Sequence, residues 1–386
     1  MSLSLYVAVA LVALPTLVLL IELAAALPRS RPVAPAPAVG VRVAVLVPAH
    51  DEERGIAATL ATIAPQLRAG DRLLVVADNC GDATAARARA AGADVVERSD
   101  ALRRGKSFAV ASGVGYLAGD APDVVIIVDA DCRVEAGAVD ALRAAAVERP
   151  AQAAYLMRAP DGAPPSRRLA ELMFLLRNVA RPLGLARLGL PCLLTGAGMA
   201  FPWALIRCAP LDSGSVVEDL QLAVDLAADG TPPRFCPAAR VVSQFPRTDV
   251  AAVAQQTRWS WGVLRAMRQA PRLVRAAWRH RQPSLMALAA ELAVPPLAIL
   301  FALWTLLIVA TAAAGLLQGT WRPLVAAAAG AGAAVLVVVL AWARFARDRV
   351  PLGVLLGAPL YVWPALRATL VALIRRRQKW NRTARD

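Results

Sequence analysis

The chain has 386 residues, of which 58% are hydrophobic and 18% are charged, and its mean hydropathy is +0.51. This composition is too apolar for an ordinary soluble protein and indicates a membrane protein with a folded extramembrane domain. The net charge of +15 does not indicate a nucleic-acid partner, because the basic residues gather beside apolar segments and form no aromatic-interleaved patch. Two histidines, and five cysteines without a CxxC pair, argue against a Ser-His-Asp hydrolase and a zinc site and favour a reducing, cytoplasmic compartment.

Residues 3–27 are almost continuously apolar and are long enough to cross a bilayer. A cleaved signal peptide is the alternative, since small residues near the end of this run could form a cleavage site. Positive residues follow the run and none precedes it, which favours an uncleaved anchor at residues 1–28 with its N-terminus outside. The Pro- and Ala-rich residues 29–40 predict a semi-rigid linker.

Short apolar strands and helices then alternate. Strands are predicted at residues 41–47, 72–77, 94–97 and 123–128, with helices at 52–63, 83–91 and 107–117 between them. This repetition predicts an α/β fold with a mainly parallel sheet covered on both faces. Functional side chains are expected at the carboxyl ends of the strands, where open α/β sheets bind ligands.

Acidic residues follow three of these strands. Asp51 lies in PAHDEE, Asp78 lies in ADNCGD, and the strand DVVIIV runs into Asp129 and Asp131. Two carboxylates one residue apart suit a hard divalent cation that bridges to a substrate diphosphate. The alternatives are a solvated loop for the Asp-x-Asp pair, a helix cap for Asp51 and a simple turn for the ADNCGD segment. His50 is interpreted as structural.

Two further motifs follow in the central part of the chain. Thr195 and Gly196 belong to a run of small residues, which allows close approach of the backbone to a bulky ligand or forms a tight turn before a strand. Glu218 and Asp219 open a predicted helix at residues 219–228, where acids also complement the helix dipole. The four residues are candidates for a binding site, and the tight turn and the ordinary helix start are the structural alternatives.

The pentapeptide QQTRW contains Arg258 and Trp259 and lies in a basic amphipathic region, residues 249–284. A guanidinium binds phosphate in a bidentate manner, and an indole face packs well against a sugar ring. The alternative is an interfacial helix whose tryptophans anchor it among lipid headgroups.

The C-terminal part is apolar again. Two crossings are predicted within residues 285–343, the first of them bent at a Pro-Pro pair. Residues 352–374 are interrupted by Pro and Gly, and a crossing there would place basic residues outside. A re-entrant or interfacial segment is therefore favoured within residues 344–386, which also hold a basic tail around Trp380.

The order and spacing of these motifs resemble the membrane-bound, inverting family-2 glycosyltransferases with a GT-A fold, such as the cellulose, hyaluronan and poly-N-acetylglucosamine synthases. The matching segments are PAHDEE, ADNCGDATA, RRGKS, VDAD, VED in place of the usual TED, and QxxRW without a gap. The tail KWNRTAR is similar to the WGTR-type motif of the hyaluronan and chitin-type synthases but lacks its glycine. The resemblance implies a GT-A catalytic domain at residues 41–248.

The resemblance also implies a role for each motif. Asp219 would be the general base that takes the proton from the acceptor hydroxyl as the sugar inverts. Mg2+ or Mn2+ would be held by Asp131 and Asp129. The residues implied to bind the nucleotide and diphosphate of the donor are Asp51, Asp78, Lys106, Asp129, Arg258 and Trp380. The residues implied to bind the acceptor are Thr195, Gly196, Glu218 and Trp259.

The implied activity is transfer of a sugar from a nucleotide-diphosphate donor, with UDP favoured, to a growing polysaccharide. Single transfer to a lipid acceptor, such as a polyprenyl phosphate or a glycolipid, is the alternative, and a non-catalytic nucleotide-sugar-binding membrane subunit is a third reading. The expected partners are the donor, a glycan or lipid-linked acceptor and the bilayer, and a glycan channel would need a homo-oligomer or an export partner. A multi-pass protein of the inner membrane with a cytoplasmic catalytic domain is expected.

Overall fold

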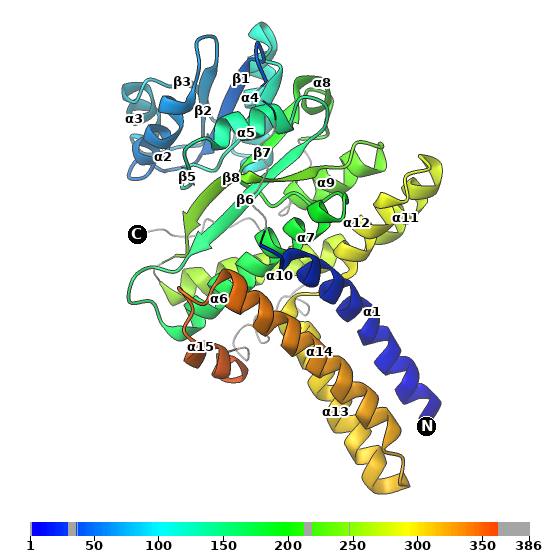
Figure 1. Ribbon diagram of the computed structural model, residues 1–386. Helices are drawn as coiled ribbons and strands as arrows, with labels where there is room; N and C mark the ends of the chain where they lie inside the picture. Colours follow the sequence, from blue (N-terminus) through cyan, green and yellow to red (C-terminus); the bar gives the residue numbers. More distant parts are fainter. Residues whose placement is uncertain (1, 30–35, 37, 212–217, 247, 362–386) are drawn as a thin grey trace.

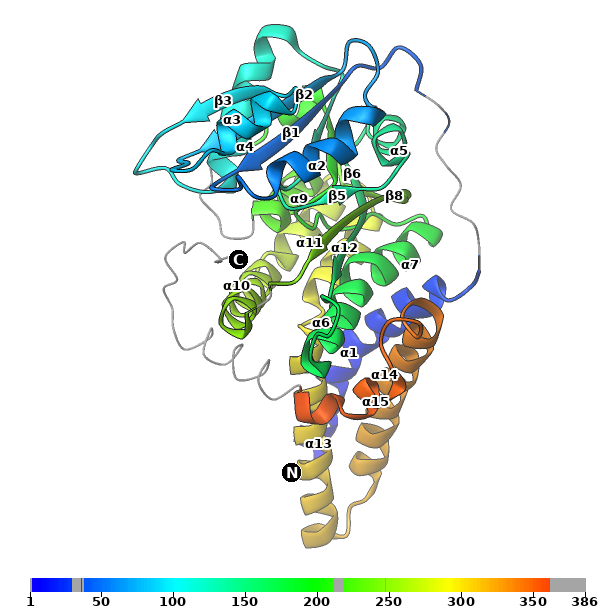
Figure 2. The same cartoon turned by 90° about the vertical axis from the view of Figure 1, so that its left-hand side faces the viewer.

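The computed structural model describes residues 2–29, 36, 38–211, 218–246 and 248–361. A sheet with packed helices occupies one end of the molecule, and a group of long helices extends away from it (Figure 1). Figure 2 shows the same separation after a quarter turn. The sheet contains the acid-bearing segments, so the molecule divides into a part that carries the candidate chemistry and an apolar helical part.

The sheet has eight strands in the order β3-β2-β1-β4-β7-β6-β8-β5. β1 pairs in parallel with β2 and β4, and β2 with β3, whereas β7 runs antiparallel between β4 and β6. The predicted mainly parallel α/β sheet is thus confirmed. The strands are β1 Val43–Ala49, β2 Arg72–Asp78, β3 Asp94–Arg98, β4 Val124–Ile127, β5 Arg133–Val134, β6 Ala151–Arg158, β7 Met199–Pro202 and β8 Arg234–Gln244.

Helices cover both faces of the sheet, because successive side chains of a strand point to opposite sides. Val43, Val45 and Val47 of β1 belong to the core cluster that includes α2 and α5, whereas Ala44 and Leu46 belong to the cluster of α4 and α9. The helices of this part are α2 Ile56–Ile63, α3 Thr84–Ala90, α4 Lys106–Leu117, α5 Ala138–Ala145, α6 Pro165–Leu175, α7 Arg181–Arg187, α8 Trp203–Ile206, α9 Glu218–Ala228, α10 Asp249–Met267 and α11 Ala270–Arg279.

Some elements differ from the sequence expectation. β1 extends two residues further than predicted, to Ala49, so that His50 and Asp51 follow it immediately. The helix expected from residue 52 begins only at Ile56, because the loop after β1 turns through Asp51 with a left-handed backbone, φ +51°. Strands β5, β6 and β8 were not predicted; β5 has only two residues and β6 is rich in alanine. β7 was expected only in the reading of Thr195 and Gly196 as part of a tight turn before a strand.

Three helices are long and apolar enough to cross a membrane: α1 Ser2–Ala26, α13 Leu297–Gln318 and α14 Arg322–Phe345. They lie together on the side away from the sheet (Figure 1). The Nε1–H of Trp304 in α13 donates to Thr16 Oγ1 in α1 at 3.0 Å, which satisfies two polar groups inside the apolar bundle. The three helices indicate membrane association.

The crossing predicted from residue 285 is shorter than expected. The prolines at 295 and 296 divide it into a separate helix, α12 Ser284–Ala293, and the long helix α13. Of these two helices, only α13 is long enough to span a membrane. After α14 the chain forms a short helix, α15 Leu352–Leu356, while residues 362–386, which include the end of the expected re-entrant segment and Trp380, lie outside the described residues.

A close crossing of α1 and α7 joins the two parts of the molecule. A Cβ on Gly184 would lie 1.8 Å from the carbonyl oxygen of Glu22, so only glycine allows this approach. Arg181 in α7 donates from Nε to Glu22 Oε2 at 2.5 Å and from Nη2 to the carbonyl oxygen of Glu291 in α12 at 3.2 Å. The buried guanidinium thus ties two helices of the apolar part to the sheet part.

Candidate active site

Asp51 lies at the carboxyl end of β1 and faces the neighbouring loop after β2. Its Oδ1 accepts a hydrogen bond from the Gly81 N–H at 2.7 Å, and its Oδ2 lies 3.7 Å from His50 Nε2. Gly55 is the N-cap of α2 and no side chain caps it. The alternative reading of Asp51 as a helix cap is therefore wrong, and its carboxylate instead joins two loops at one edge of the sheet.

Asp78 ends β2 and is almost completely buried, with 4% of its surface exposed. Arg98, which lies opposite Asp78 in the register of β2 and β3, forms an ion pair with Oδ1 at 2.5 Å. Asn79 Nδ2 donates to the same oxygen at 2.9 Å, and the Gly105 N–H lies 3.5 Å from Oδ2. Asp78 is thus a positioned carboxylate rather than a turn residue, and Arg98 is a participant that the sequence reasoning missed.

Lys106, the first residue of α4, connects three parts of the site. Its ammonium forms an ion pair with Asp129 at the end of β4 and donates to the carbonyl oxygen of Gly196 at 2.7 Å. Burial opposes the charged form, but Asp129 and Glu218 outweigh it and raise the pKa of Lys106 above its ordinary value. The predicted Lys106 therefore carries a firmly held positive charge beside the Asp-x-Asp pair.

Asp129 and Asp131 follow β4 directly. Together with Cys132 they present ligand atoms within 4.8 Å of one another. Ser243 Oγ in β8 donates to Asp131 Oδ2 at 2.6 Å, which orients that carboxylate. Two carboxylates form an oxygen donor set that suits Mg2+ or Mn2+, so these residues fit the expected cation, whereas the Cys132 thiol does not.

Glu218 and Asp219 form the first turn of α9 and face the same region. A Cβ added to Gly196, which has φ +98°, would lie 3.4 Å from Asp219 Oδ2 and 3.9 Å from Lys106 Nζ. Burial raises the pKa of Glu218 to about 7 and also raises the pKa of Asp219, although Lys106 acts against both shifts. A carboxylate in this position can accept a proton near neutral pH.

The loop that carries Thr195 and Gly196 is held by Gln152 of β6, another residue that sequence reasoning missed. The Thr195 N–H donates to Gln152 Oε1 at 2.9 Å, and Gln152 Nε2 donates to the Ala197 carbonyl oxygen at 2.8 Å. Gln152 is fully buried. The small-residue loop is thus a rigid feature placed next to Asp219, and no signal in the sequence links it to Gln152.

Two pockets lie at the first turn of α9. The first is lined by Lys106, Glu218, Asp219 and apolar residues of α4, β7 and α9, such as Val110, Met199 and Leu222. The second lies toward the apolar helices and is lined by Arg177, Arg181, Pro182, Leu193, Thr195, Leu220, Val263, Glu291, Leu292 and Val294. The first pocket thus includes Asp219, and the second includes its neighbour Leu220 and reaches α12.

The second pocket contains polar groups that the sequence reasoning did not include. Within the described residues, Thr195 Oγ1 and Glu291 Oε2 are buried without a hydrogen-bond partner. Arg177, in the π-helical turn Leu176–Ala180 between α6 and α7, also lines it, and burial lowers its pKa while Asp219 acts in the opposite direction. Unsatisfied buried polar atoms of this kind are costly unless a ligand or water pairs with them.

The QxxRW residues lie on α10. The Trp259 ring packs against Phe174 at 5.6 Å between centroids, and Phe174 also contacts Tyr155 and Phe245. Arg258 and Trp259 do not belong to the lining of either pocket beside Asp219. In this structure Trp259 packs against the protein core rather than reaching outward as a membrane anchor, and its expected contact with an acceptor stays a prediction.

This chain is similar to solved structures. A mannosyltransferase, PcManGT from Pyrobaculum calidifontis, in complex with GDP-Man and Mn2+, has 19% sequence identity and a TM-score of 0.57, with 95% of this chain and 98% of that chain covered. Glucosyl-3-phosphoglycerate synthase from Mycobacterium tuberculosis, in complex with Mn2+, UDP and phosphoglyceric acid, has 20% identity and a TM-score of 0.41, covering 59% of this chain and 78% of that one. No curated protein gives a significant match.

A family model also matches this sequence. It describes the glycosyltransferase-like family 2, and residues 40–262 match it. That range contains more than half of the 386 residues and every strand of the sheet, together with the acids at the strand ends. The chain therefore belongs to the glycosyltransferase-like family 2.

Proposed function

We propose that this protein is a metal-dependent, inverting glycosyltransferase that moves a sugar from a nucleotide-diphosphate donor to an acceptor held at the membrane. The observation that carries this proposal is the meeting of Lys106, Asp129, Glu218 and Asp219 around Gly196, from four separate segments of the chain. A cation next to a carboxylate pair suits a diphosphate, and a carboxylate with a raised pKa suits a hydroxyl group that must lose a proton.

The donor is proposed to lie along the carboxyl ends of β1, β2 and β4. Asp51 and Asp78 accept hydrogen bonds from the nucleoside, and Lys106 lies near the diphosphate as a point charge. UDP is the nucleotide that the sequence resemblance favours. The GDP-Man bound to the Pyrobaculum calidifontis mannosyltransferase makes GDP-mannose a second donor for testing.

Asp129 and Asp131 are proposed to hold Mg2+ or Mn2+, and when bound this cation would neutralise the negative charge of the departing diphosphate. Ser243 keeps Asp131 in one orientation through its 2.6 Å hydrogen bond. Lys106 adds a second positive charge beside Asp129. The protein thus provides a preorganised electrostatic environment for a leaving group that gains charge as the glycosidic bond breaks.

Asp219 is proposed as the general base. Its carboxylate accepts the acceptor O–H proton, the freed oxygen forms a bond to the anomeric carbon, and the bond from that carbon to the diphosphate oxygen breaks with its electron pair. One displacement of this kind inverts the anomeric centre. Burial and the neighbouring charge of Asp129 raise the pKa of Asp219 and so keep its proton affinity high.

The acceptor is proposed to enter through the second pocket. Its unpartnered Thr195 Oγ1 and Glu291 Oε2 and the guanidinium of Arg177 offer donors and acceptors to a polar group, and Glu291 belongs to α12 beside the apolar helices. The QxxRW match favours a growing polysaccharide as the acceptor. Single transfer to a lipid acceptor is the second candidate, because this pocket reaches toward the bundle and three helices form a small bundle for a glycan channel.

The test uses the purified full-length protein in liposomes with labelled UDP-sugars and GDP-mannose, with and without Mn2+. Metal-dependent incorporation of label into a polymer or an extractable lipid supports the proposal, and the length of the product separates the two acceptors. Binding of nucleotide without incorporation, in the presence of lipid and glycan acceptors, would favour the non-catalytic subunit and contradict the proposal.

A further inference from the structure

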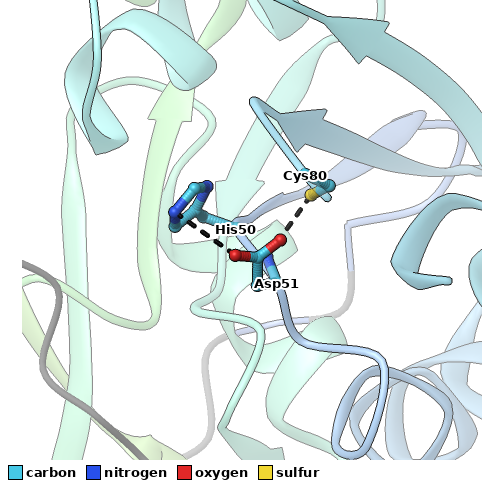
Figure 3. A group of neighbouring side chains, drawn as sticks. All are labelled: His50, Asp51 and Cys80. Atoms are coloured by element: carbon cyan, nitrogen blue, oxygen red, sulfur yellow. Dashed lines mark hydrogen bonds and ion pairs between the residues drawn. The ribbon is translucent and has the colours of Figure 1, made fainter. Parts of the chain in front are cut away.

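A second group of metal-ligating side chains lies at the ends of β1 and β2. His50, Asp51 and Cys80 each offer a ligand atom, and these atoms lie within 4.8 Å of one another. Figure 3 shows Asp51 between the other two, with dashed lines that join it to both. An imidazole, a carboxylate and a thiol form a mixed nitrogen, oxygen and sulfur set, unlike the carboxylates of Asp129 and Asp131.

Hydrogen bonding fixes the state of the His50 ring. Nδ1 lies 2.7 Å from the carbonyl oxygen of Asp78, which can only accept, so Nδ1 carries the hydrogen. In the neutral ring Nε2 then holds the lone pair, which is the tautomer that binds a metal. Nε2 lies 3.7 Å from Asp51 Oδ2, close to the ~3.4 Å expected between two ligands about 2.1 Å from a tetrahedral zinc ion.

The Cys80 sulfur also has suitable surroundings. The Asp51 N–H points at Sγ from 3.4 Å, and Sγ lies 3.6 Å from the Ala49 carbonyl oxygen, to which the thiol can donate. The thiol is half-buried. When a metal replaces the thiol proton, the Asp51 N–H remains as a donor to the sulfur.

We propose that His50, Asp51 and Cys80 bind a borderline-soft divalent cation such as zinc, with the fourth position open to water. Binding replaces the Cys80 S–H bond with a sulfur–metal bond and releases the proton to solvent, and no group is oxidised or reduced. The lack of a CxxC pair argued against a zinc site, but that argument covers only ligands that are close in sequence. These three ligands come together from the ends of two neighbouring strands. The structural role expected for His50 becomes that of a ligand.

This site shares Asp51 with the proposed donor site, a consequence that rests on the proposed function. Zinc on Asp51 Oδ2 would take the oxygen that faces His50 and reduce the negative charge of the carboxylate, while Oδ1 already accepts from the Gly81 N–H, so zinc and the nucleoside should compete for Asp51. Mn2+ and Mg2+, which prefer oxygen ligands, should leave this site unoccupied. The protein would then distinguish an ion that supports transfer from an ion that blocks it.

The test uses cobalt(II) as a spectroscopic probe on the purified full-length protein without nucleotide. We expect tetrahedral visible bands and a thiolate-to-cobalt charge-transfer band, both removed by equimolar zinc. Cys80→Ser should abolish the charge-transfer band and weaken cobalt binding by more than the roughly tenfold that loss of an outer hydrogen-bond partner alone costs. Cys132→Ser, which alters the thiol beside Asp131, is the matched control and should keep the band.

The opposite pattern, with the band kept by Cys80→Ser or lost in Cys132→Ser, would overturn the proposal, as would an absent band in the wild type. His50→Gln provides a second variant and should weaken cobalt binding as well, and equal unfolding temperatures in EDTA show that both variants fold. A nucleotide whose binding is measured on the same sample should displace cobalt. Failure of UDP and GDP to bind would count against the proposed function and leave the cobalt result as it stands.

Discussion

Lys106 occupies the point where the charges of the site meet. It is bonded to Asp129 and to the Gly196 carbonyl oxygen, and it acts electrostatically on Glu218 and Asp219. Without its charge the carboxylates would repel one another, since Asp219 and Asp129 raise the pKa of Glu218 and Asp129 raises the pKa of Asp219. The lysine thus allows an acid-rich cleft to exist and leaves Asp219 with a proton affinity suited to a base.

The raised pKa values predict how transfer depends on pH. Asp219 must be ionised to accept a proton, and burial raises its pKa above that of an ordinary aspartate, so kcat/KM should fall on the acidic side at a higher pH than an ordinary aspartate would give, by roughly tenfold per unit at the acidic end. Glu218→Gln keeps both Asp219 and its neighbour Asp129, so the acidic fall should remain in this variant. The measurement is a pH–rate profile of both proteins.

Unfolding does not explain such a fall. A carboxyl group whose pKa is raised by folding stabilises the protein below its unfolded pKa, near 4.5 for Glu218, and that contribution is lost as the pH rises through about 7. The contribution of Glu218 to stability therefore increases in the range where activity decreases. A profile that stays flat down to about pH 4, where an ordinary aspartate titrates, would contradict the assignment of a base with a raised pKa.

Arg98 should matter for donor binding, because it holds the buried Asp78. Arg98→Ala leaves that carboxylate without its ion pair, and loss of a hydrogen bond to a charged group costs about 1.5–3 kcal/mol, so the KM for the donor should rise roughly tenfold or more while kcat changes less. Arg103→Ala is the control, since Arg103 contributes only its carbonyl oxygen to Arg98. An unchanged KM in Arg98→Ala would contradict the role given to Asp78.

At the scale of elements, parallel β strands made the site partly predictable. Apolar strands that run into acids identified Asp51, Asp78, Asp129 and Asp131, because the ends of parallel strands share one edge of the sheet. Gln152 and Arg98 could not be predicted in the same way. Their roles depend on a loop across the sheet and on the register of an edge strand, neither of which leaves a local pattern in the sequence.

The C-terminal elements show a different limit. Hydropathy identified an apolar segment from residue 285, but it did not show that the Pro-Pro pair separates α12 from the spanning helix and brings Glu291 to the second pocket. The QxxRW motif likewise identified Trp259 without showing that its ring packs on Phe174. Composition finds apolar segments, whereas their partners depend on tertiary packing.

The α1–α7 crossing predicts a sensitive position far from the cleft. Gly184→Ala forces the backbone of Glu22 to move, and overpacking of this kind costs about 1–3 kcal/mol, so the unfolding temperature in detergent should fall by several degrees. Gly115→Ala is the control: this exposed helical glycine in α4 has no atom within 4 Å of its added Cβ. Alanine favours a helix, so this variant should be as stable as the wild type or more so. Equal stability of the two variants would contradict a tight crossing.

At the scale of the whole molecule, the fold places a charged cleft next to an apolar bundle. One pocket is lined by Lys106 and Asp219, and a second is lined by Leu220 and by Glu291 of α12. The proposed base therefore lies close to the elements that adjoin the three long apolar helices α1, α13 and α14. On the proposed function, a water-soluble donor and a membrane-held acceptor would meet at the start of α9.

Metal removal tests the arrangement of the donor side. Treatment of the liposome-bound protein with EDTA should abolish transfer, and Mn2+ or Mg2+ should restore it, because Asp129 and Asp131 form an oxygen donor set. Ser243→Ala, which removes the hydrogen bond to Asp131, should raise the Mn2+ concentration needed for half-maximal activity by roughly tenfold. Full activity in EDTA would contradict a metal-dependent mechanism.

The most direct measurement compares nucleotide binding and sugar transfer for Asp219→Asn and Asp131→Ala in the same liposome preparation. We expect Asp219→Asn to lose transfer by at least about a hundredfold while its nucleotide affinity stays close to that of the wild type, and Asp131→Ala to lose both. Asparagine keeps the size of the side chain and cannot take a proton. Transfer by Asp219→Asn at close to the wild-type rate would contradict the claim that this carboxylate is the base of a glycosyl transfer.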